Sequence, residues 1–249
     1  MSTKESKAEF YFSADGERLR GVRWGDPASP AVVFLHGAGE SNVERLEPFA
    51  YEVVSAGFSG WSFDFSGHGK STGVLSDLSL QRRQAQALAL AALVAEHSSI
   101  VGLCGSSMSG QTVSDISNRL DPRAVCLVCP AAYAADASSV QFGAGFTELI
   151  RRPRSWATSL AYGEIASFLG GVVLVTAGRD AVIPDGVTER YLAAGRNRTA
   201  GFAHVHFENA PHTLGQWMKN NEADRVRAAQ AFISLLRDEE TSPAPEIDT

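Results

Sequence analysis

The hydrophobic positions of this chain form short runs and helically spaced segments that alternate along the sequence. Two stretches of alternating polarity come first, at Glu9–Ser13 and Glu17–Trp24, and the Asp15-Gly16 pair between them signals a hairpin. Short apolar runs then predict strands at Ala31–Leu35, Phe58–Phe65, Ile100–Cys104, Ala124–Cys129, Val172–Thr176 and Ala203–Glu208. Helical spacing predicts helices at Val43–Ala56, Leu78–Glu96, Met108–Leu120, Pro184–Ala194 and Leu214–Leu236.

This order of elements predicts an α/β fold with a mostly parallel central β-sheet and helices on both of its faces. Continuous apolar strands separated by helices are typical of parallel sheets that are buried on both sides. Because crossovers are right-handed, the carboxyl ends of the strands share one edge, where ligand sites of α/β proteins form. The length of 249 residues favours a single domain that spans residues 1–249.

One segment, from Ala131 to Leu169, interrupts the alternation because it contains no predicted strand. Two short helical stretches lie within it, near Phe146–Arg151 and near Tyr162–Leu169. The pattern predicts a small helical cap, inserted at about 131–169, over the active-site edge of the sheet. The acidic residues at about 238–249 predict a mobile tail.

Composition and charge argue against several classes of partner. The net charge is −6, from 22 basic and 28 acidic residues, which gives no electrostatic basis for binding nucleic acid or an anionic membrane. No apolar run follows the polar first residues as a signal peptide requires, and no run is long enough to span a bilayer. We therefore expect a cytoplasmic protein without nucleic-acid or membrane partners, whose oligomeric state stays open.

The three cysteines, Cys104, Cys126 and Cys129, lie in or at the ends of apolar, strand-like runs. An odd number of cysteines in such positions is typical of reduced core thiols in the cytoplasm. The Cys126-x-x-Cys129 spacing formally matches a redox motif, but such motifs need an exposed first cysteine at the start of a helix. We therefore favour core thiols over a redox site, and we expect no cofactor.

The stretch Gly105-Ser106-Ser107-Met108-Ser109 is typical of a nucleophile elbow, a sharp strand-to-helix turn that lifts a serine above the sheet. The turn needs small residues two positions before and two positions after the serine. Ser107 has Gly105 before it and Ser109 after it, whereas Ser106 would place the bulky Met108 at the second of these positions. We therefore predict Ser107 as the nucleophile, with helix capping by a serine as the structural alternative.

A serine nucleophile requires a base and an orienting acid, and after this type of elbow the acid precedes the histidine in the chain. Asp180 comes just after an apolar strand run, whereas its rival Asp185 follows a proline and suits the first turn of a helix. His212 lies in a loop directly after the last predicted strand, whereas His204 and His206 lie within that strand. These positions predict Asp180 as the acid and His212 as the base.

The oxyanion formed during acyl transfer needs backbone N–H donors. One donor is predicted to be Met108, the residue after the nucleophile at the start of a helix. The other is predicted to be Ala38, in the loop His36-Gly37-Ala38-Gly39, where glycines allow the backbone to approach a substrate closely. A plain turn would explain the same two glycines.

Two further motifs suggest other chemistry and are set aside. Gly67-His68-Gly69-Lys70-Ser71 ends like a phosphate loop, but a Walker motif needs glycine at position 64, which is aspartate here. His36, His68 and Asp64 could suggest a metal site, yet they lack a tight ligand spacing. We therefore expect neither a nucleotide nor a metal ion.

Together these motifs resemble those of the α/β-hydrolase superfamily, from about Glu9 to Leu236. The matching pieces are the elbow, His36-Gly37-Ala38-Gly39, Asp64-Phe65-Ser66-Gly67-His68-Gly69-Lys70-Ser71, Gly178-Arg179-Asp180 with Ile183-Pro184, and Pro211-His212. Within the superfamily the chain is similar to small-cap serine hydrolases, which include cinnamoyl/feruloyl-esterase-like, monoglyceride-lipase-like and dienelactone-hydrolase-like proteins. The resemblance implies a catalytic triad and an oxyanion hole, made by Ser107, Asp180, His212, Ala38 and Met108. Ser109 departs from the family pattern, which has glycine there.

These expectations favour a serine hydrolase that cleaves small carboxylic esters through an acyl-enzyme. A thioesterase acting on pantetheine-linked acyl groups and a non-catalytic ligand-binding protein of the same fold are the alternatives. A cap of this length cannot bury a long acyl chain, so short or compact aromatic acyl groups are expected. Phe142, Phe146 and Trp156 are candidate pocket walls, although core packing explains them equally well.

The basic cluster Arg151, Arg152 and Arg154 lies within the predicted cap. Guanidinium groups bind carboxylate and phosphate in a bidentate manner, so the cluster could recognise an anionic substrate or carrier. A solvated helix end explains it as well, because positive charge suits the carboxyl end of a helix.

Overall fold

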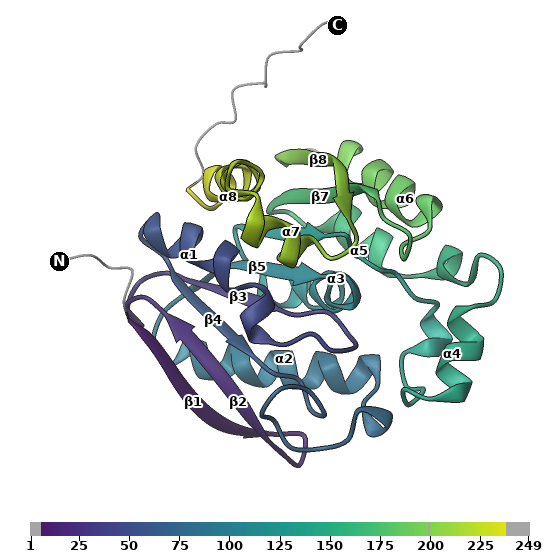
Figure 1. The fold of residues 1–249 in the computed structure, drawn as a ribbon, viewed down its shortest axis with the longest axis horizontal. Coiled ribbons are helices and arrows are strands. Elements are labelled where there is room, and N and C mark those ends of the chain that lie inside the picture. The colour runs from purple at the N-terminus through teal and green to yellow at the C-terminus, as the bar shows by residue number, and fades with distance from the viewer. Residues whose placement is uncertain (1–5, 199, 238–249) are drawn as a thin grey trace, which may run out of the picture.

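The computed structural model describes residues 6–198 and 200–237, so the predicted tail at about 238–249 lies outside the described residues. Within them the chain forms one eight-stranded sheet in the order β1-β2-β4-β3-β5-β6-β7-β8 (Figure 1). The strands are β1 (Lys7–Ala14), β2 (Glu17–Trp24), β3 (Ala31–Leu35), β4 (Ser59–Phe63), β5 (Ile100–Ser106), β6 (Ala124–Val128), β7 (Gly171–Arg179) and β8 (Phe202–Pro211). The helices are α1 (Glu47–Ser55), α2 (Leu80–Ala95), α3 (Met108–Leu120), α4 (Ala144–Ile150), α5 (Ala161–Ser167), α6 (Asp185–Arg196), α7 (Leu214–Asn220) and α8 (Glu222–Leu236).

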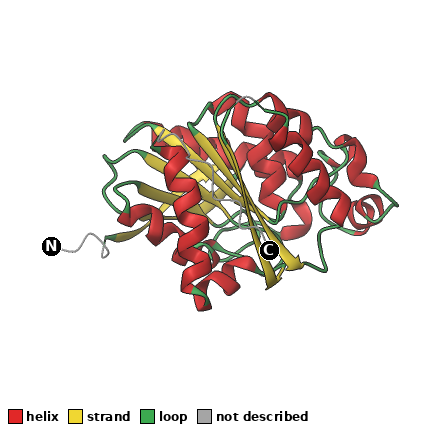
Figure 2. Ribbon diagram, turned by 90° about the horizontal axis from the view of Figure 1, so that it is seen from above, coloured by secondary structure: helices red, strands yellow, loops and turns green. Residues whose placement is uncertain are grey.

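Parallel pairing dominates this sheet. The β1–β2 hairpin is antiparallel and joins β4 in antiparallel fashion, whereas all pairs from β4 and β3 through β8 are parallel. Helices α2, α3, α5 and α6 contribute to the apolar core on one face of the sheet, and α1, α7 and α8 contribute to the core on the other. Figure 2 shows the strands running between these two helical layers. The predicted α/β fold with a mostly parallel sheet is therefore confirmed.

Two of the predicted helices are interrupted. The first begins with a 3₁₀ turn at Val43–Arg45, and α1 follows with Pro48 in its first turn, where the missing N–H of proline costs nothing. The last one divides into α7 and α8 at Asn221, whose side chain donates to the carbonyl of Trp217 at 2.9 Å. The apolar spacing continues across both breaks, so the pattern alone could not reveal them.

The last two strands extend beyond their predicted ends, and this extension matters for the site. Strand β7 continues to Arg179 and β8 to Pro211, and these two residues pair with each other after a register shift that follows Ala177. The residues that come next, Asp180 and His212, therefore leave neighbouring parallel strands at the same edge of the sheet.

The segment between β6 and β7 contains α4, α5 and two short 3₁₀ turns, and no strand. Helix α5 packs against α3 and α6, whereas α4 lies apart at one edge of the molecule (Figure 1). A small apolar cluster joins this edge to the elbow, because Phe146 of α4 and Ala137 pack against Met108 and Leu80. No helix in the described part of the chain has the length and apolarity needed to cross a membrane.

Candidate active site

Ser107 occupies the sharp turn between β5 and α3. Its backbone has φ 53° and ψ −117°, a left-handed conformation that non-glycine residues rarely adopt. Three hydrogen bonds hold this conformation: the Ser107 amide donates to Val128 O at 2.9 Å, and the Ser107 carbonyl accepts from the amides of Gly110 at 2.8 Å and Ala131 at 2.9 Å. A strained backbone that its surroundings fix so firmly is typical of a functional position.

Two glycines provide the close packing that the turn requires. A Cβ atom at Gly105 would lie 2.3 Å from the carbonyl oxygen of Ser109, and one at Gly110 would lie 2.3 Å from Cβ of Pro130. Glycine is therefore required at positions 105 and 110, and Ser109 between them is fully buried.

Ser109 also forms a specific contact of its own. Its hydroxyl donates to the carbonyl of His36 at 2.6 Å and accepts from Nη2 of Arg83 at 2.7 Å. The same guanidinium nitrogen donates to the His36 carbonyl at 2.7 Å. Arg83 is fully buried, lies over the ring of Phe65, and has two guanidinium nitrogens without a partner among the described residues. Burial lowers its pKa to about 9. This contact was not predictable from the sequence, because an arginine in a helical pattern predicts an exposed side chain.

Ser107, His212 and Asp180 form a continuous chain of hydrogen bonds. The Ser107 Oγ lies 3.0 Å from His212 Nε2, and His212 Nδ1 lies 2.8 Å from Asp180 Oδ2. The other carboxylate oxygen, Oδ1, accepts from the amides of Val182 at 2.8 Å and Ile183 at 2.9 Å. Burial opposes ionisation of Asp180, but the bonds from His212 and the two amides outweigh it and lower the pKa of this carboxyl.

None of the alternative residues takes part in this chain of hydrogen bonds. Asp185 is the first residue of α6, as expected for a carboxylate in the first turn of a helix. His204 and His206 lie on β8, and both rings are 2.8 Å from the hydroxyl of Thr176. Ser106 is the last residue of β5, and none of the hydrogen bonds to His212 among the described residues involves it.

The loop that contains Gly37 and Ala38 lies directly against the elbow. A Cβ atom at Gly37 would be 3.2 Å from Cβ and 3.8 Å from Oγ of Ser107, so glycine keeps this approach open. Among the described residues, the amides of Ala38 and Met108 have no hydrogen-bond acceptor. Both are therefore free to donate to a bound ligand.

The cavity beside Ser107 is small, with a volume of about 200 Å³. Ser107, His212, Ala38, Glu40 and Arg45 are among the residues that line it. The expected pocket walls are not part of this lining. Phe142 and Phe146 pack against each other at 4.6 Å between ring centroids, and Trp156 packs over Gly186 at the start of α6. Core packing therefore accounts for these three aromatic residues.

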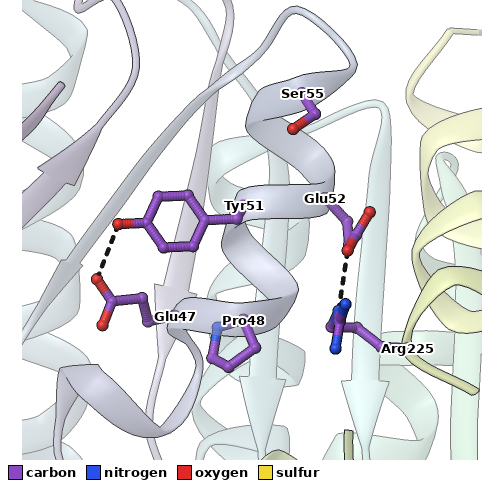
Figure 3. Close-up of a pocket in the computed structure, with 6 residues that line it drawn as sticks. All are labelled: Glu47, Pro48, Tyr51, Glu52, Ser55 and Arg225. Atoms are coloured by element: carbon purple, nitrogen blue, oxygen red, sulfur yellow. Dashed lines mark hydrogen bonds and ion pairs between the residues drawn. The ribbon is translucent and has the colours of Figure 1, made fainter. Parts of the chain in front are cut away.

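A larger cavity, of about 380 Å³, lies between α1 and α8 (Figure 3). Its described lining includes Glu47, Tyr51, Glu52 and Arg225, and no histidine, cysteine or arrangement resembling the chain at Ser107. Glu52 and Arg225 pair across it at 2.9 Å, and Tyr51 donates to Glu47 at 3.1 Å, so its polar groups bind one another (Figure 3). Ser107 and His212 instead line the smaller cavity.

His36 and Asp64, considered above as potential metal ligands, have structural partners. Nε2 of His36 accepts from the amide of Phe65 at 3.1 Å, so its Nδ1 carries the proton and donates to Gly37 O at 2.7 Å. Burial, together with the charge of Arg83, holds the pKa of His36 well below its usual value. The fully buried Asp64 accepts from the amide of Val43 at 3.0 Å and from other donors.

A different set of potential metal ligands lies at the candidate site itself. The sulfur of Cys129, a carboxylate oxygen of Asp180 and a ring nitrogen of His212 lie within 4.8 Å of one another. Cys129 follows β6 directly, and its place at the end of an apolar run predicted a core thiol. No pattern in the sequence relates it to Asp180 and His212, because the three residues come from separate strand ends.

A family model matches part of this sequence, and solved structures share its fold. Residues 26–162, more than half of the chain, match the family model described as serine aminopeptidase, S33. No curated protein sequence matches the chain at a significant level.

Solved structures of hydrolases superimpose on nearly the whole chain at low sequence identity. A thioesterase domain from the curacin biosynthetic pathway has a TM-score of 0.65 at 16% identity, covering 94% of this chain and 100% of its own. Est1E from Butyrivibrio proteoclasticus, with ferulic acid bound, has a TM-score of 0.65 at 15% identity, covering 88% and 99%. A Pyrococcus furiosus esterase has a TM-score of 0.63 at 18% identity, covering 91% and 89%. At such identities these likenesses show the fold alone.

Proposed function

Because this chain belongs to the serine aminopeptidase S33 family of α/β-hydrolases, we propose that it is a serine hydrolase that cleaves small carboxylic esters. In this proposal Ser107 is the nucleophile, His212 the general base and Asp180 the acid that orients it. The observation that carries the proposal is the continuous chain of hydrogen bonds from Ser107 Oγ to Asp180 Oδ2, with distances of 3.0 Å and 2.8 Å.

The hydrogen-bond directions support the assignment of each role. The carboxylate of Asp180 only accepts, so Nδ1 of His212 carries the ring proton and Nε2 presents its lone pair to Ser107. His212 can then take the hydroxyl proton as Ser107 Oγ attacks the acyl carbon, and return it to the leaving alkoxide. Water attacks the resulting acyl-enzyme by the same route.

We propose the amides of Ala38 and Met108 as the oxyanion hole. Met108 follows Ser107 at the start of α3, where the helix dipole favours negative charge. Ala38 is held near Ser107 by the approach of Gly37 to the elbow. Two donors that do not need to reorient can stabilise the tetrahedral intermediate strongly, since the loss of one such donor costs about 10²–10³ in kcat.

The residues at about 131–169 are proposed as the cap, within a single domain spanning residues 1–249. The contacts of Phe146 and Ala137 with Met108 support this role, because they bring the segment next to the oxyanion hole. Arg151, Arg152 and Arg154 are exposed and do not line the cavity at Ser107, which favours the solvated-helix-end explanation. The three free cysteines support a reducing, cytoplasmic setting.

The size of the cavity predicts the substrate profile. Ligand pockets usually measure about 300–1,000 Å³, so about 200 Å³ suits a short or compact acyl group. Each buried CH₂ adds about 0.8 kcal/mol of binding only while it stays inside the pocket. On nitrophenyl esters we expect kcat/KM to peak at short or compact aromatic acyl groups and to be lower, by about tenfold or more, for decanoyl and longer chains.

Acyl-pantetheine thioesters and amino-acid anilides should be assayed beside the nitrophenyl esters. We expect turnover of the esters to exceed that of both other classes. Activity that keeps rising to long-chain esters, or that is confined to thioesters or to anilides, would replace the esterase assignment by that of a lipase, a thioesterase or an aminopeptidase. Inactivity on every class would favour the non-catalytic alternative.

The buried contact between Arg83 and His36 predicts a second measurable effect. Arg83 fixes the carbonyl that directly precedes Gly37, so it positions the proposed oxyanion loop without touching the substrate. Arg83→Met keeps the volume and removes the donors, and we expect kcat to fall by about 10–100-fold with little change in KM, which is less than the loss of an oxyanion donor itself.

Ser109→Gly is the matched control, because it restores the family residue and leaves the bond from Arg83 to His36 in place. We expect a smaller loss of kcat from this variant. Thermal unfolding of both variants identifies any loss of fold. A folded Arg83→Met protein with unchanged kcat would show that Arg83 does not position the loop.

A further inference from the structure

A third cavity, of about 310 Å³, is lined by Asp180 but not by Ser107 or His212. Its lining contains the Cys129 thiol, the imidazoles of His204 and His206, and the carboxyl groups of Asp180, Asp185 and Glu189. None of its described lining residues is a lysine or an arginine. A concave site lined by carboxylates, imidazoles and a thiol attracts cations, and Asp180 is the one lining residue that the proposed hydrolysis uses.

Cys129 is the unusual member of this lining. It has φ 42°, a left-handed conformation that is costly for a side chain with a Cβ, and its amide is held by a 2.8 Å bond to Val175 O. The side chain is almost fully buried, and its sulfur lies within 4.8 Å of Asp180 and His212 ligand atoms. Burial and the adjacent Asp180 charge raise the pKa of the thiol, so it is protonated when the cavity holds no cation.

We propose that Cys129, Asp180 and His212 form a binding site for a thiophilic divalent cation, Zn²⁺, and that occupation of the site inhibits the hydrolase. The three residues offer one sulfur, one oxygen and one nitrogen atom, which are the ligand types that Zn²⁺ takes in proteins. Zn²⁺ bonds measure about 2.0–2.3 Å, so ligand atoms separated by up to 4.8 Å can reach one ion with small side-chain movements. Water from the cavity would supply the fourth position.

The inhibitory part rests on the proposed role of His212 as the base. Nδ1 of His212 faces Asp180, so a cation shared with Asp180 binds at Nδ1 and takes the place of the proton there. That proton moves to Nε2, and the ring then presents an N–H to Ser107 instead of a lone pair. A base without a lone pair cannot accept the hydroxyl proton. The Cys129 thiol loses its proton to solvent on binding, since a thiol coordinated to zinc is deprotonated.

The test of binding is a titration of the full-length, reduced protein with Co²⁺ as a spectroscopic substitute for Zn²⁺. A thiolate bound to Co²⁺ gives a near-ultraviolet charge-transfer band, which carboxylate and imidazole ligands do not give. We expect the band in the wild type, in Cys104→Ala and in Cys126→Ala, and its loss in Cys129→Ser. The chain has three cysteines, so a band that persists in both Cys104→Ala and Cys126→Ala comes from Cys129. The test therefore holds even where Cys129→Ser does not fold.

The test of inhibition compares the loss of ester hydrolysis on addition of Zn²⁺, with each protein measured against its own metal-free activity. We expect Zn²⁺ to inhibit the wild type and a chelator to restore its activity. In Cys129→Ser the apparent affinity for Zn²⁺ should fall by more than roughly 10–100-fold, which is the loss expected when a residue that only supports a metal ligand is removed. His206→Gln is the control for a surface site made by the two histidines of β8, and it should be inhibited like the wild type.

Each contrary outcome has a distinct meaning. An active hydrolase without the Co²⁺ band overturns the metal site and leaves the proposed function standing. Zn²⁺ affinity that depends on His206 and not on Cys129 also overturns it, because the cation would then bind on β8. A Cys129-dependent band without inhibition overturns the proposed contact with His212. A protein that hydrolyses no substrate but shows the band refutes the proposed function alone.

Discussion

Ser107→Ala is expected to abolish labelling by a fluorophosphonate probe and to lower kcat by roughly a millionfold, the scale seen when the nucleophile of such a triad is removed. Among the described serines, Ser107 alone combines a 3.0 Å contact with a histidine and a position next to two unoccupied backbone amides. The variant should remain folded, because the three backbone bonds that hold the turn do not involve the hydroxyl. Active-site labelling and steady-state kinetics measure the two effects.

Ser106→Ala is the matched control, since it removes the neighbouring hydroxyl from the end of β5 and leaves the turn intact. Its labelling and turnover should stay close to those of the wild type. If the label instead persists in Ser107→Ala and disappears in Ser106→Ala, the nucleophile has been assigned to the wrong serine.

The fold was predictable because its signals are local and repeated. Every predicted strand lies within a residue or two of an observed one at its start, and the parallel order follows from the alternation of strands and helices. The breaks at Leu46 and Asn221 were not predictable, because the apolar positions needed for packing continue on both sides of them. Tertiary contacts, rather than the pattern, decide where these helices divide.

The residues of the candidate site were predictable to the extent that they follow strand ends. Asp180 and His212 come directly after paired positions of β7 and β8, and the sequence places both just beyond apolar runs. Arg83 and Cys129 gave no such signal. Arg83 is fully buried and donates to the Ser109 hydroxyl and the His36 carbonyl, and Cys129 lies near Asp180 with a left-handed backbone. Neither contact follows from residue type or spacing, because each depends on how separate elements pack.

Asp180→Asn is expected to lower turnover by roughly ten-thousandfold while the fold is retained, and the structure supplies the reason. Oδ1 of Asp180 accepts from the amides of Val182 and Ile183, so the oxygen of an asparagine must occupy that position. Its NH₂ group then faces Nδ1 of His212, which has to accept. The ring proton moves to Nε2, and His212 can no longer take the proton of Ser107.

Asp185→Asn separates this effect from the general loss of a carboxylate near the site. Asp185 begins α6 and borders the same cavity as Asp180, but it makes no hydrogen bond to His212 among the described residues. Its replacement should cost only about 0.3–1 kcal/mol of helix stability, since a negative charge at the start of a helix is worth that much. Kinetics and thermal unfolding of the two variants measure the difference. If Asp185→Asn loses turnover and Asp180→Asn keeps it, the acid has been misassigned, and the tautomer argument for both the triad and the zinc site fails with it.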